Sequence, residues 1–298
     1  MFIIKNKFVF LAISAVIVVG SIIAVLVYGL KLGIDFKGGT LLEVNYTAGR
    51  PEAALVSSVL KKDALEDAVA QQVGATSLSV KSRPLSEAER TTLVTDLSIE
   101  GKYPLTQTSF TSIGPSVGRE LTQKAIVAII VVVIAIVLYI AFAFRGVSKP
   151  VASWKYGLIA IATLVHDVAI PSGLFAVLGH YTGAEVDTLF VVALLTVLGI
   201  SVSDTIVVFD RIRENLKNHV APTFPQTVGK SLSQTIGRSI NTSLTVLIVL
   251  VALFFFGPAA TKNFALVLIT GMFFGTYSSI FVASPLLVLV EKWQGNKK

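Results

Sequence analysis

Six long apolar segments dominate this sequence and limit the folds that it can adopt. The hydrocarbon core of a bilayer needs about 20 apolar residues of helix to span it. Segments of about this length lie at 8–28, 125–144, 156–178, 186–209, 240–256 and 264–290. Only 14% of the residues are charged, whereas soluble proteins carry about 25%. The sequence therefore predicts an α-helical polytopic membrane protein with six transmembrane helices.

The first segment could also be a cleaved signal peptide, because Lys5 and Lys7 precede it. Its apolar run is too long for a signal peptide, and no A-x-A cleavage site follows it. We therefore interpret it as a retained anchor helix. The fifth segment is the shortest, and its start is the least well defined because it begins with polar residues.

The distribution of Lys and Arg predicts the orientation of these helices, because basic residues in short loops favour the cytoplasmic side. With a cytoplasmic N-terminus, most of the basic residues fall inside: Lys5, Lys7, Arg145, Lys149, Lys155, Arg211, Arg213, Lys217, Lys230, Arg238, Lys292, Lys297 and Lys298. The two short outer loops then hold only Lys262 as a basic residue, together with Glu185 and Asp187. We therefore expect residues 1–30 to form the cytoplasmic N-terminus and first helix, and residues 125–298 the other five helices with a cytoplasmic C-terminus.

The stretch 31–124 has the composition of a folded domain in water, on the extracytoplasmic side. Residues 40–47, 76–83 and 105–113 alternate like strands. Residues 51–73 carry apolar side chains at helical spacing between an initial Pro and a terminal Gly. Ser86 and Glu89 have the spacing of a capping box at the start of a second helix. These patterns predict a small α+β domain with helices on one face of the sheet.

Asp204 lies inside the fourth apolar segment, with Ser201 one helical turn before it on the same face. A charged side chain at the centre of a membrane helix costs about 2.5–3.5 kcal/mol on insertion scales and usually faces the bundle interior. A carboxyl group in such a place can load and release a proton. The plainer alternative is a carboxylate that only tethers two helices.

Arg238 begins the fifth apolar segment, on the same membrane side as Asp204. Asn241, Thr242 and Thr245 follow it and share one helix face, which predicts a polar stripe. Arg238 is the candidate partner of Asp204. The alternative is a basic anchor that extends to the membrane surface.

His166 and Asp167 lie in the middle of the third segment. Either they form a proton relay, since His titrates near neutral pH, or they join helices by hydrogen bonds. Adjacent helix positions point about 100° apart, so we do not expect both side chains on one narrow face. Gly271 and Gly275 form a GxxxG motif in the sixth segment, which predicts close helix packing.

Composition and motifs exclude several other kinds of site. The chain has no Cys and three His, so we predict no metal centre and no cofactor. Gly229 and Lys230 resemble part of a phosphate-binding loop, but Phe224 stands where that loop requires Gly. The basic residues follow the inner loops without interleaved aromatic residues, so we predict no nucleic-acid binding. No enzymatic site is predicted.

Five motifs resemble those of the SecF members of the SecD/SecF family. They lie, in order, at residues 33–40 (GIDFKGGT), 112–121 (SIGPSVGREL), 166–167 (HD), 202–215 (VSDTIVVFDRIREN) and 238–243 (RSINTS). Ser203 departs from the family pattern, which commonly has Asn there. Gly38 and Gly39 in the first motif would permit positive φ or close backbone approach. In the second motif, we expect a tight turn before the second helix, formed by Gly114, Pro115 and Gly118.

The resemblance implies a role in bacterial protein export, in the cell membrane. Members of this family pair with SecD in a twelve-helix unit similar to the resistance–nodulation–division transporters. They work beside the SecYEG channel, usually with YajC, and use the proton motive force, or sodium in some organisms, to move exported polypeptide chains. The residues that match Asp204 and Arg238 are implicated in ion movement, and His166 and Asp167 gain less support.

Two other functions remain open at this stage. A purely structural subunit would leave all ion chemistry to its partner, and it would tolerate the loss of the Asp204 charge. Half of a small-molecule exporter would need a substrate-sized cavity in the extracytoplasmic domain.

Overall fold

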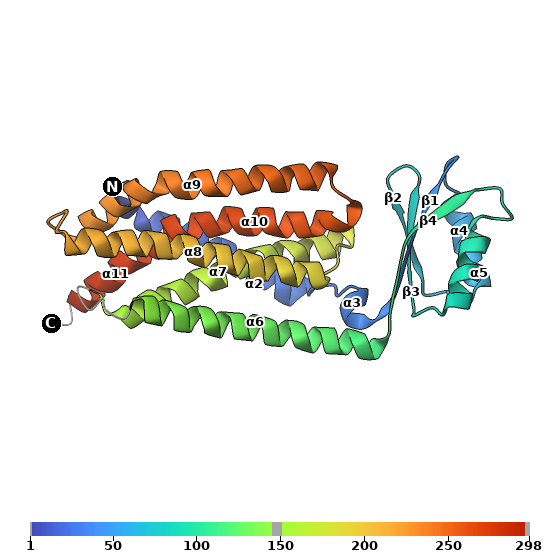
Figure 1. Cartoon of the computed structure of the whole chain (residues 1–298), viewed down its shortest axis with the longest axis horizontal. Helices are drawn as coiled ribbons and strands as arrows, with labels where there is room; N and C mark the ends of the chain where they lie inside the picture. The colour runs from blue at the N-terminus through green and yellow to red at the C-terminus, as the bar shows by residue number, and fades with distance from the viewer. Residues whose placement is uncertain (1, 145–150, 296–298) are drawn as a thin grey trace. The chain divides into compact units, whose positions relative to one another are not determined.

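The computed structural model describes residues 2–144 and 151–295. They form two compact units, a helical unit of residues 2–31, 127–144 and 151–295 and a sheet unit of residues 32–126. Figure 1 shows the helices of the first unit and the sheet of the second. Of the basic residues assigned above to the inner side, Arg145, Lys149, Lys297 and Lys298 lie outside the described residues.

Counted over the described residues, six helical segments are long and apolar enough to cross a membrane. After the short α1 (Phe2–Lys5), the first five are α2 (Lys7–Tyr28), α6 (Pro115–Ala143), α7 (Ser153–Thr182), α8 (Thr188–Lys217) and α9 (Phe224–Phe256). The sixth comprises α10 (Lys262–Ser278) and α11 (Ser284–Gly295), joined by a π-helical turn, η2 (Ser279–Ala283). A short 3₁₀ turn, η1 (Ala259–Thr261), precedes it. The predicted number of membrane helices is confirmed.

Two helix starts differ from the prediction. Helix α6 begins at Pro115, ten residues before the predicted start at 125, because a helix tolerates Pro in its first turn. Helix α9 begins at Phe224, before the predicted start at 240. Its polar first half packs against α8, where the amide of Asn215 donates to Ser231 and Gln234, both at 2.8 Å. Arg238 therefore lies in the middle of α9, and its predicted position at the helix start is wrong.

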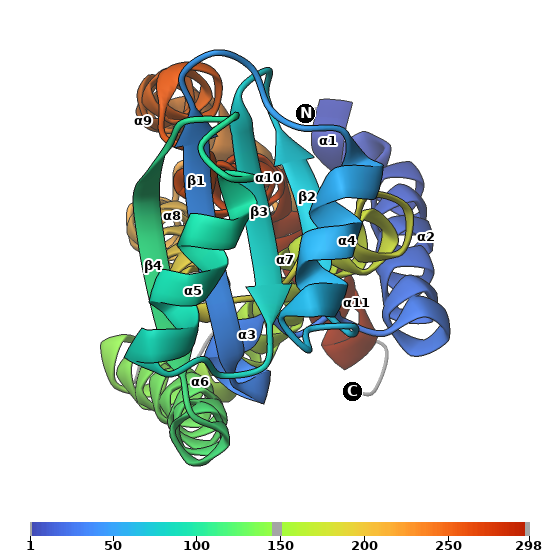
Figure 2. The same cartoon turned by 90° about the vertical axis from the view of Figure 1, so that its right-hand side faces the viewer.

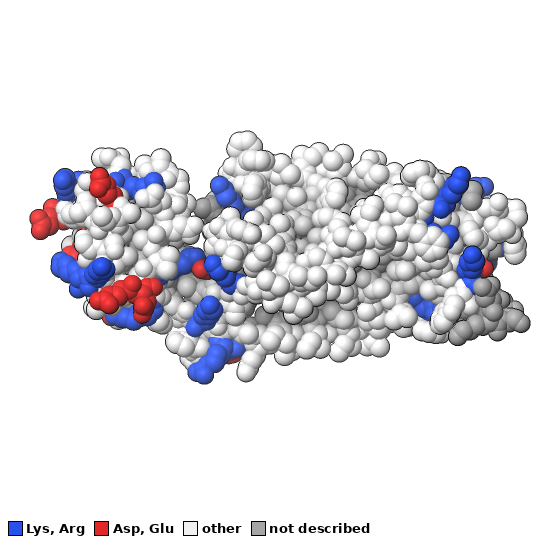
Figure 3. Space-filling view, turned by 180° about the vertical axis from the view of Figure 1, so that it is seen from behind, with Lys and Arg blue, Asp and Glu red and all other residues white. Residues whose placement is uncertain are grey.

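Three of the six segments form the interior of the helical unit. Within the most apolar 18 residues of each segment, 56% of the residues of α7, 44% of those of α8 and 56% of those of the sixth segment are buried. The corresponding share is 6% in α2, 6% in α6 and 11% in α9. Helix α2 packs on α7 so closely that a Cβ on Gly173 would lie 2.4 Å from Cβ of Ser21. It also contacts the sixth segment, where the rings of Phe10 and Phe281 are 4.7 Å apart. Figure 3 shows a face of this unit whose middle carries no charged side chain. Exposed apolar side chains of α2, α6 and α9 cover much of its outer surface.

The second unit is a four-stranded antiparallel sheet in the order β2-β3-β1-β4. Its strands are β1 (Gly39–Tyr46), β2 (Val69–Val73), β3 (Ser77–Ser82) and β4 (Leu105–Ile113), and its helices are the short α3 (Ile34–Lys37), α4 (Ala53–Lys62) and α5 (Glu87–Leu97). Figure 2 shows α4 and α5 on one face of this sheet. Side chains of the strands and of these two helices, including Leu42, Val44, Leu60 and Leu93, form one core. The predicted α+β fold and the three predicted strands are confirmed.

The predicted helix at 51–73 is wrong in its second half. Helix α4 ends at Lys62, and Ala64 takes a positive φ of 54° that breaks the helix. Residues Val69–Val73 then pair with β3 as an edge strand. The apolar spacing misled the prediction, because Leu65 is buried in the core from a loop and not from a helix.

The predicted capping box at α5 is confirmed, and it provides a pH-dependent contribution to stability. Hydrogen bonds from Arg83 and from Ser86 lower the pKa of Glu89 from 4.5 to about 2. A carboxylate whose pKa is lowered on folding stabilises the fold above its unfolded pKa and loses this effect as the pH falls. We expect Glu89→Gln to lower the thermal midpoint at pH 6, and the deficit to disappear as the pH falls from about 4.5 to about 2. Thermal unfolding of the full chain would measure this, and a deficit that stays constant with pH would contradict it.

The two glycine-containing motifs of this unit contact each other. Gly38 and Gly39 have φ of 79° and 137°. A Cβ on Gly39 would lie 2.8 Å from the carbonyl oxygen of Ser82, and one on Gly38 would lie 3.0 Å from Cα of Pro115. Both positions therefore combine a left-handed backbone with a close approach of other backbone atoms.

The predicted tight turn at Gly114, Pro115 and Gly118 takes a different form. Gly118 lies in the first turn of α6, and its N–H donates to the carbonyl of Gly114 at 3.0 Å. A Cβ on Gly118 would lie 2.8 Å from the backbone nitrogen of Gly38. Gly118 is therefore needed for the contact between the two motifs, and not for a turn.

Candidate functional site

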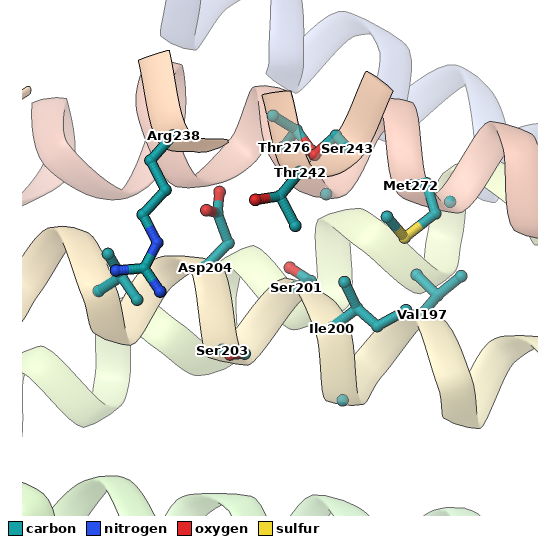
Figure 4. A pocket seen from close by; sticks show the side chains of 14 residues that line it. Val197, Ile200, Ser201, Ser203, Asp204, Arg238, Thr242, Ser243, Met272 and Thr276 are labelled. Carbon is teal, nitrogen blue, oxygen red and sulfur yellow. The ribbon is translucent and has the colours of Figure 1, made fainter. Parts of the chain in front are cut away.

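A cavity of about 260 Å³ lies between α8, α9 and α10. In Figure 4, Arg238 and Asp204 lie toward one end of it, and Val197 and Met272 toward the other. The lining residues are Val197, Gly199, Ile200, Ser201, Ser203, Asp204, Val207, Arg238, Thr242, Ser243, Gly271, Met272, Gly275 and Thr276. An acidic side chain, a basic side chain and several hydroxyl groups thus line one cavity between membrane-spanning helices.

Asp204 is held by two serine hydroxyls from two different segments. Ser239 of α9 donates to Oδ1 at 2.5 Å, and Ser279 of η2 donates to Oδ2. The carboxyl group is half-buried, whereas both serines are buried. This carboxylate therefore joins the fourth, fifth and sixth membrane segments.

Arg238 lines the same cavity but is not paired with Asp204. Within the described residues, the polar contacts of the Asp204 carboxylate come from Ser239 and Ser279, and no ion pair joins it to Arg238. Arg238 is exposed, and its side chain extends past the carboxylate toward α8 (Figure 4). The structure brings the two predicted residues to one cavity, and hydroxyl groups take the place of the predicted cationic partner.

His166 and Asp167 form a second polar cluster, behind the cavity. His166 Nδ1 lies 2.8 Å from Oδ1 of Asp167, although we expected these adjacent side chains on different faces of the helix. The side chains turn toward each other along the helix. Ser201 of α8 and Ser278 of α10 donate to Oδ2 of Asp167, the latter at 2.9 Å. All four residues are buried, and Ser201 also lines the cavity.

The predicted polar stripe on α9 is only partly at the site. Thr242 lines the cavity, whereas Asn241 and Thr245 are exposed and do not. Thr245 donates to the backbone carbonyl of Thr242 at 2.8 Å. Ser243, the residue after Thr242, forms a hydrogen bond with the hydroxyl of Thr276 on α10.

Sequence reasoning missed most of the hydroxyl groups that complete this site. They are Ser239, Ser243, Thr276, Ser278 and Ser279. Serine is common in membrane helices as a packing residue, so its presence alone does not indicate a role. The available signal was the pair Ser278–Ser279 one turn after the GxxxG motif.

Gly271 and Gly275 bring α10 against α8. A Cβ on Gly271 would lie 2.3 Å from a methyl carbon of Val197, and one on Gly275 would lie 3.2 Å from Cβ of Ser201. This close approach positions Ser278 and Ser279 to reach carboxylates on the neighbouring helices. The described residues contain no group of three or more His, Asp or Glu side chains that could hold a metal ion.

Two family models match the chain. A model described as Protein export membrane protein SecD/SecF, C-terminal, matches residues 95–293, and the SecD/SecF GG Motif matches residues 23–49. The chain belongs to the SecD/SecF family. The first match contains both carboxylate clusters, and the second contains Gly38 and Gly39.

Curated relatives and a solved structure agree with this assignment. A Protein translocase subunit SecF from Thermobaculum terrenum is 42% identical, with 97% of this chain and 93% of the relative covered. One from Anaerolinea thermophila is 38% identical, with 97% and 94% covered. The crystal structure of SecDF, a translocon-associated membrane protein from Thermus, matches with a TM-score of 0.83 and 33% identity. That match covers 98% of this chain but only 38% of the SecDF chain. This member of the SecD/SecF family is therefore a multi-pass membrane protein with the SecDF fold.

Proposed function

We propose that this chain is the SecF subunit of a protein-export complex in the bacterial cell membrane, and that it acts with SecD, beside the SecYEG channel and YajC, on exported polypeptide chains. The names of its relatives support this assignment. A SecD partner is supported by the SecDF chain, of which this chain covers 38%. In this proposal both termini are cytoplasmic and residues 31–124 are extracytoplasmic, as the basic residues of the inner loops favour. The chain itself catalyses no covalent reaction.

In our proposal, Asp204 is the residue at which an ion gradient drives this subunit. The observation that carries it is a half-buried carboxylate in a cavity of about 260 Å³ that is also lined by Arg238 and lies between three membrane-spanning helices. A proton or a sodium ion that enters the cavity would neutralise the Asp204 carboxylate. The hydrogen bonds from Ser239 and Ser279 to that carboxylate would then weaken, because hydrogen bonds to charged groups are stronger than those to neutral ones. Helices α8 and α9 and the sixth membrane segment, which meet at Asp204, would shift against one another.

The role of the ion can be tested in membrane vesicles that contain the complete export complex with this subunit. We expect this subunit to accelerate export of a secreted reporter, and this acceleration to disappear when one ion gradient is collapsed. Loss with a protonophore alone identifies the proton, and loss with a sodium ionophore alone identifies sodium. An acceleration that survives both treatments would exclude ion coupling and leave a structural subunit. Vesicles without this subunit provide the baseline.

No specific observation favours a small-molecule exporter. The sheet unit has a pocket of about 200 Å³ beside α4 and β2, whereas drug-sized ligands occupy pockets of about 300–1,000 Å³. Lys61 and Glu66 are among the residues that line it, together with aliphatic side chains from α4 and the strands.

A further inference from the structure

Two adjacent serines on the sixth membrane segment contact two different carboxylates. Ser278 is the last residue of α10 and donates to Asp167 of α7 at 2.9 Å. Ser279 is the first residue of the π-helical turn and donates to Asp204 of α8. Adjacent helical residues point about 100° apart, so one turn of this segment reaches both neighbouring helices. Both serines are fully buried.

Each of these serines also has a second acceptor within reach. The hydroxyl of Ser278 lies 3.0 Å from the carbonyl oxygen of Gly275, and that of Ser279 lies 2.9 Å from the carbonyl oxygen of Thr276. A hydroxyl group has a single proton to donate. Each serine therefore donates either to its carboxylate or to its own helix. When the carboxyl group is protonated, its O–H can donate to the serine oxygen, and the serine proton turns to the backbone carbonyl.

A second connection runs through α8. Ser201 lies one turn before Asp204, lines the cavity and donates to Asp167. Behind Asp167, the Nε2 atom of His166 is buried and has no hydrogen-bond partner among the described residues. In the described part of the chain, the titratable and charged groups near the two carboxyls are His166 on α7, which contacts Asp167, and Arg238 on α9, which lines the cavity with Asp204. Tyr277 on α10 stacks on His166, with the ring centroids 6.2 Å apart.

A π-helical turn interrupts the sixth membrane segment directly after Ser278. It occupies Ser279–Ala283, and the side-chain hydroxyl of Ser284 donates to the backbone carbonyl of Ser279 at 3.4 Å. Turns of this kind interrupt the regular α-helical hydrogen bonds and occur frequently at functional sites. The backbone after Ser278 is therefore not fixed by a continuous α-helix.

We propose that Ser278 and Ser279 couple the charge of Asp204 in the cavity to the buried pair His166–Asp167. This inference rests on the proposed function, because it assumes that Asp204 changes its charge during export. Loss of the charge on Asp204 turns the Ser279 hydroxyl toward Thr276. The turn that carries both serines then moves, and the hydrogen bond from Ser278 to Asp167 changes with it. Ser278 and Ser279 act here as positioning residues.

The ring nitrogens of His166 provide a readout for this coupling. The chain has three His, so ¹⁵N-histidine labelling of the complete complex in lipid gives few resonances, and His166→Gln assigns the relevant pair. We expect Asp204→Asn to shift the His166 nitrogen resonances. Thr242→Ala provides the matched control, because Thr242 lines the same cavity but is not one of the hydroxyl donors to either carboxylate among the described residues, and it should leave the His166 resonances in place.

The serines are tested by combining variants. In a Ser279→Ala background, Asp204→Asn should no longer shift the His166 resonances. Thr270→Ala removes a hydroxyl that donates only to its own helix, at the carbonyl of Leu266, and should preserve the shift. Unchanged His166 resonances in Asp204→Asn would overturn the proposal, and so would a shift that persists without the Ser279 hydroxyl. If export fails in Asp204→Asn while His166 is unaffected, only this inference fails. If His166 shifts while export is normal, the proposed ion-coupling role fails instead.

Discussion

Export of a secreted reporter is expected to fall to the level of cells that lack this subunit when Asp204 is replaced by asparagine. The substitution keeps the size of the side chain and one acceptor oxygen for Ser239 or Ser279, but it removes the charge that an ion would neutralise. The fold should therefore persist while energy coupling is lost. The measurement is export in cells whose only copy of the gene carries Asp204→Asn, with membrane level and partner co-purification determined in parallel.

Glu291→Gln is the matched control for this experiment. Glu291 lies on α11 and is not among the residues that line the cavity, so the loss of its charge should leave export unchanged. Normal export with Asp204→Asn would show that this carboxylate only tethers α8 to α9 and to the sixth segment. Export that fails together with membrane level or partner binding would show a structural defect, and it would contradict our expectation that the fold persists.

Gly271→Val is expected to prevent normal assembly of the helical unit. Even a single Cβ at this position would lie 2.3 Å from a methyl carbon of Val197, and valine adds two further methyl groups. Overpacking of this kind typically costs about 1–3 kcal/mol, occasionally more. Helix α10 would have to move away from α8, which would separate Ser278 and Ser279 from the two carboxylates. We expect a sharp fall in the amount of folded protein, measured by membrane level and by the thermal midpoint of the purified complex.

A compensating substitution makes this prediction specific. Val197→Ala removes the methyl groups that a side chain at position 271 would meet, so the double variant should recover part of the lost stability. Gly20→Val is the matched control, because no atom lies within 4 Å of a Cβ at Gly20 on α2. An unchanged thermal midpoint in Gly271→Val would contradict the prediction, because it would show that the helical unit does not need the close approach of α10 to α8 at this position.

Periodic and apolar patterns predicted the architecture, because these signals arise from burial that many residues share. The six apolar segments and the three alternating strands are examples. The prediction failed where a few residues override the pattern. At 51–73, the positive φ of Ala64 ends a helix whose apolar spacing continues. At the start of α9, packing on α8 extends the helix through polar residues that by themselves indicate a loop.

Of the candidate site, the charged residues were the most readily predicted, together with Ser201, Thr242 and the two glycines of the GxxxG motif. A charge within an apolar segment is conspicuous, so Asp204, Asp167 and Arg238 could be found from the sequence. Apart from His166, the partners of the two carboxylates are serines from neighbouring helices, and one-dimensional spacing cannot show which serine faces which helix. Electrostatic complementarity favoured Arg238 as the partner of Asp204, but the structure places the hydroxyls of Ser239 and Ser279 there.

The position of Ser278 and Ser279 in the chain has a consequence for biosynthesis. Asp167 and Asp204 are synthesised long before the two serines that complete their hydrogen bonds. A nascent chain that has inserted its first five membrane segments therefore carries two incompletely satisfied carboxyl groups, which are costly in lipid. Insertion of the sixth segment supplies the missing donors and also provides the ring of Phe281, which packs against Phe10 near the N-terminus. Chains that lack this segment would thus remain recognisable to membrane quality control as unfinished.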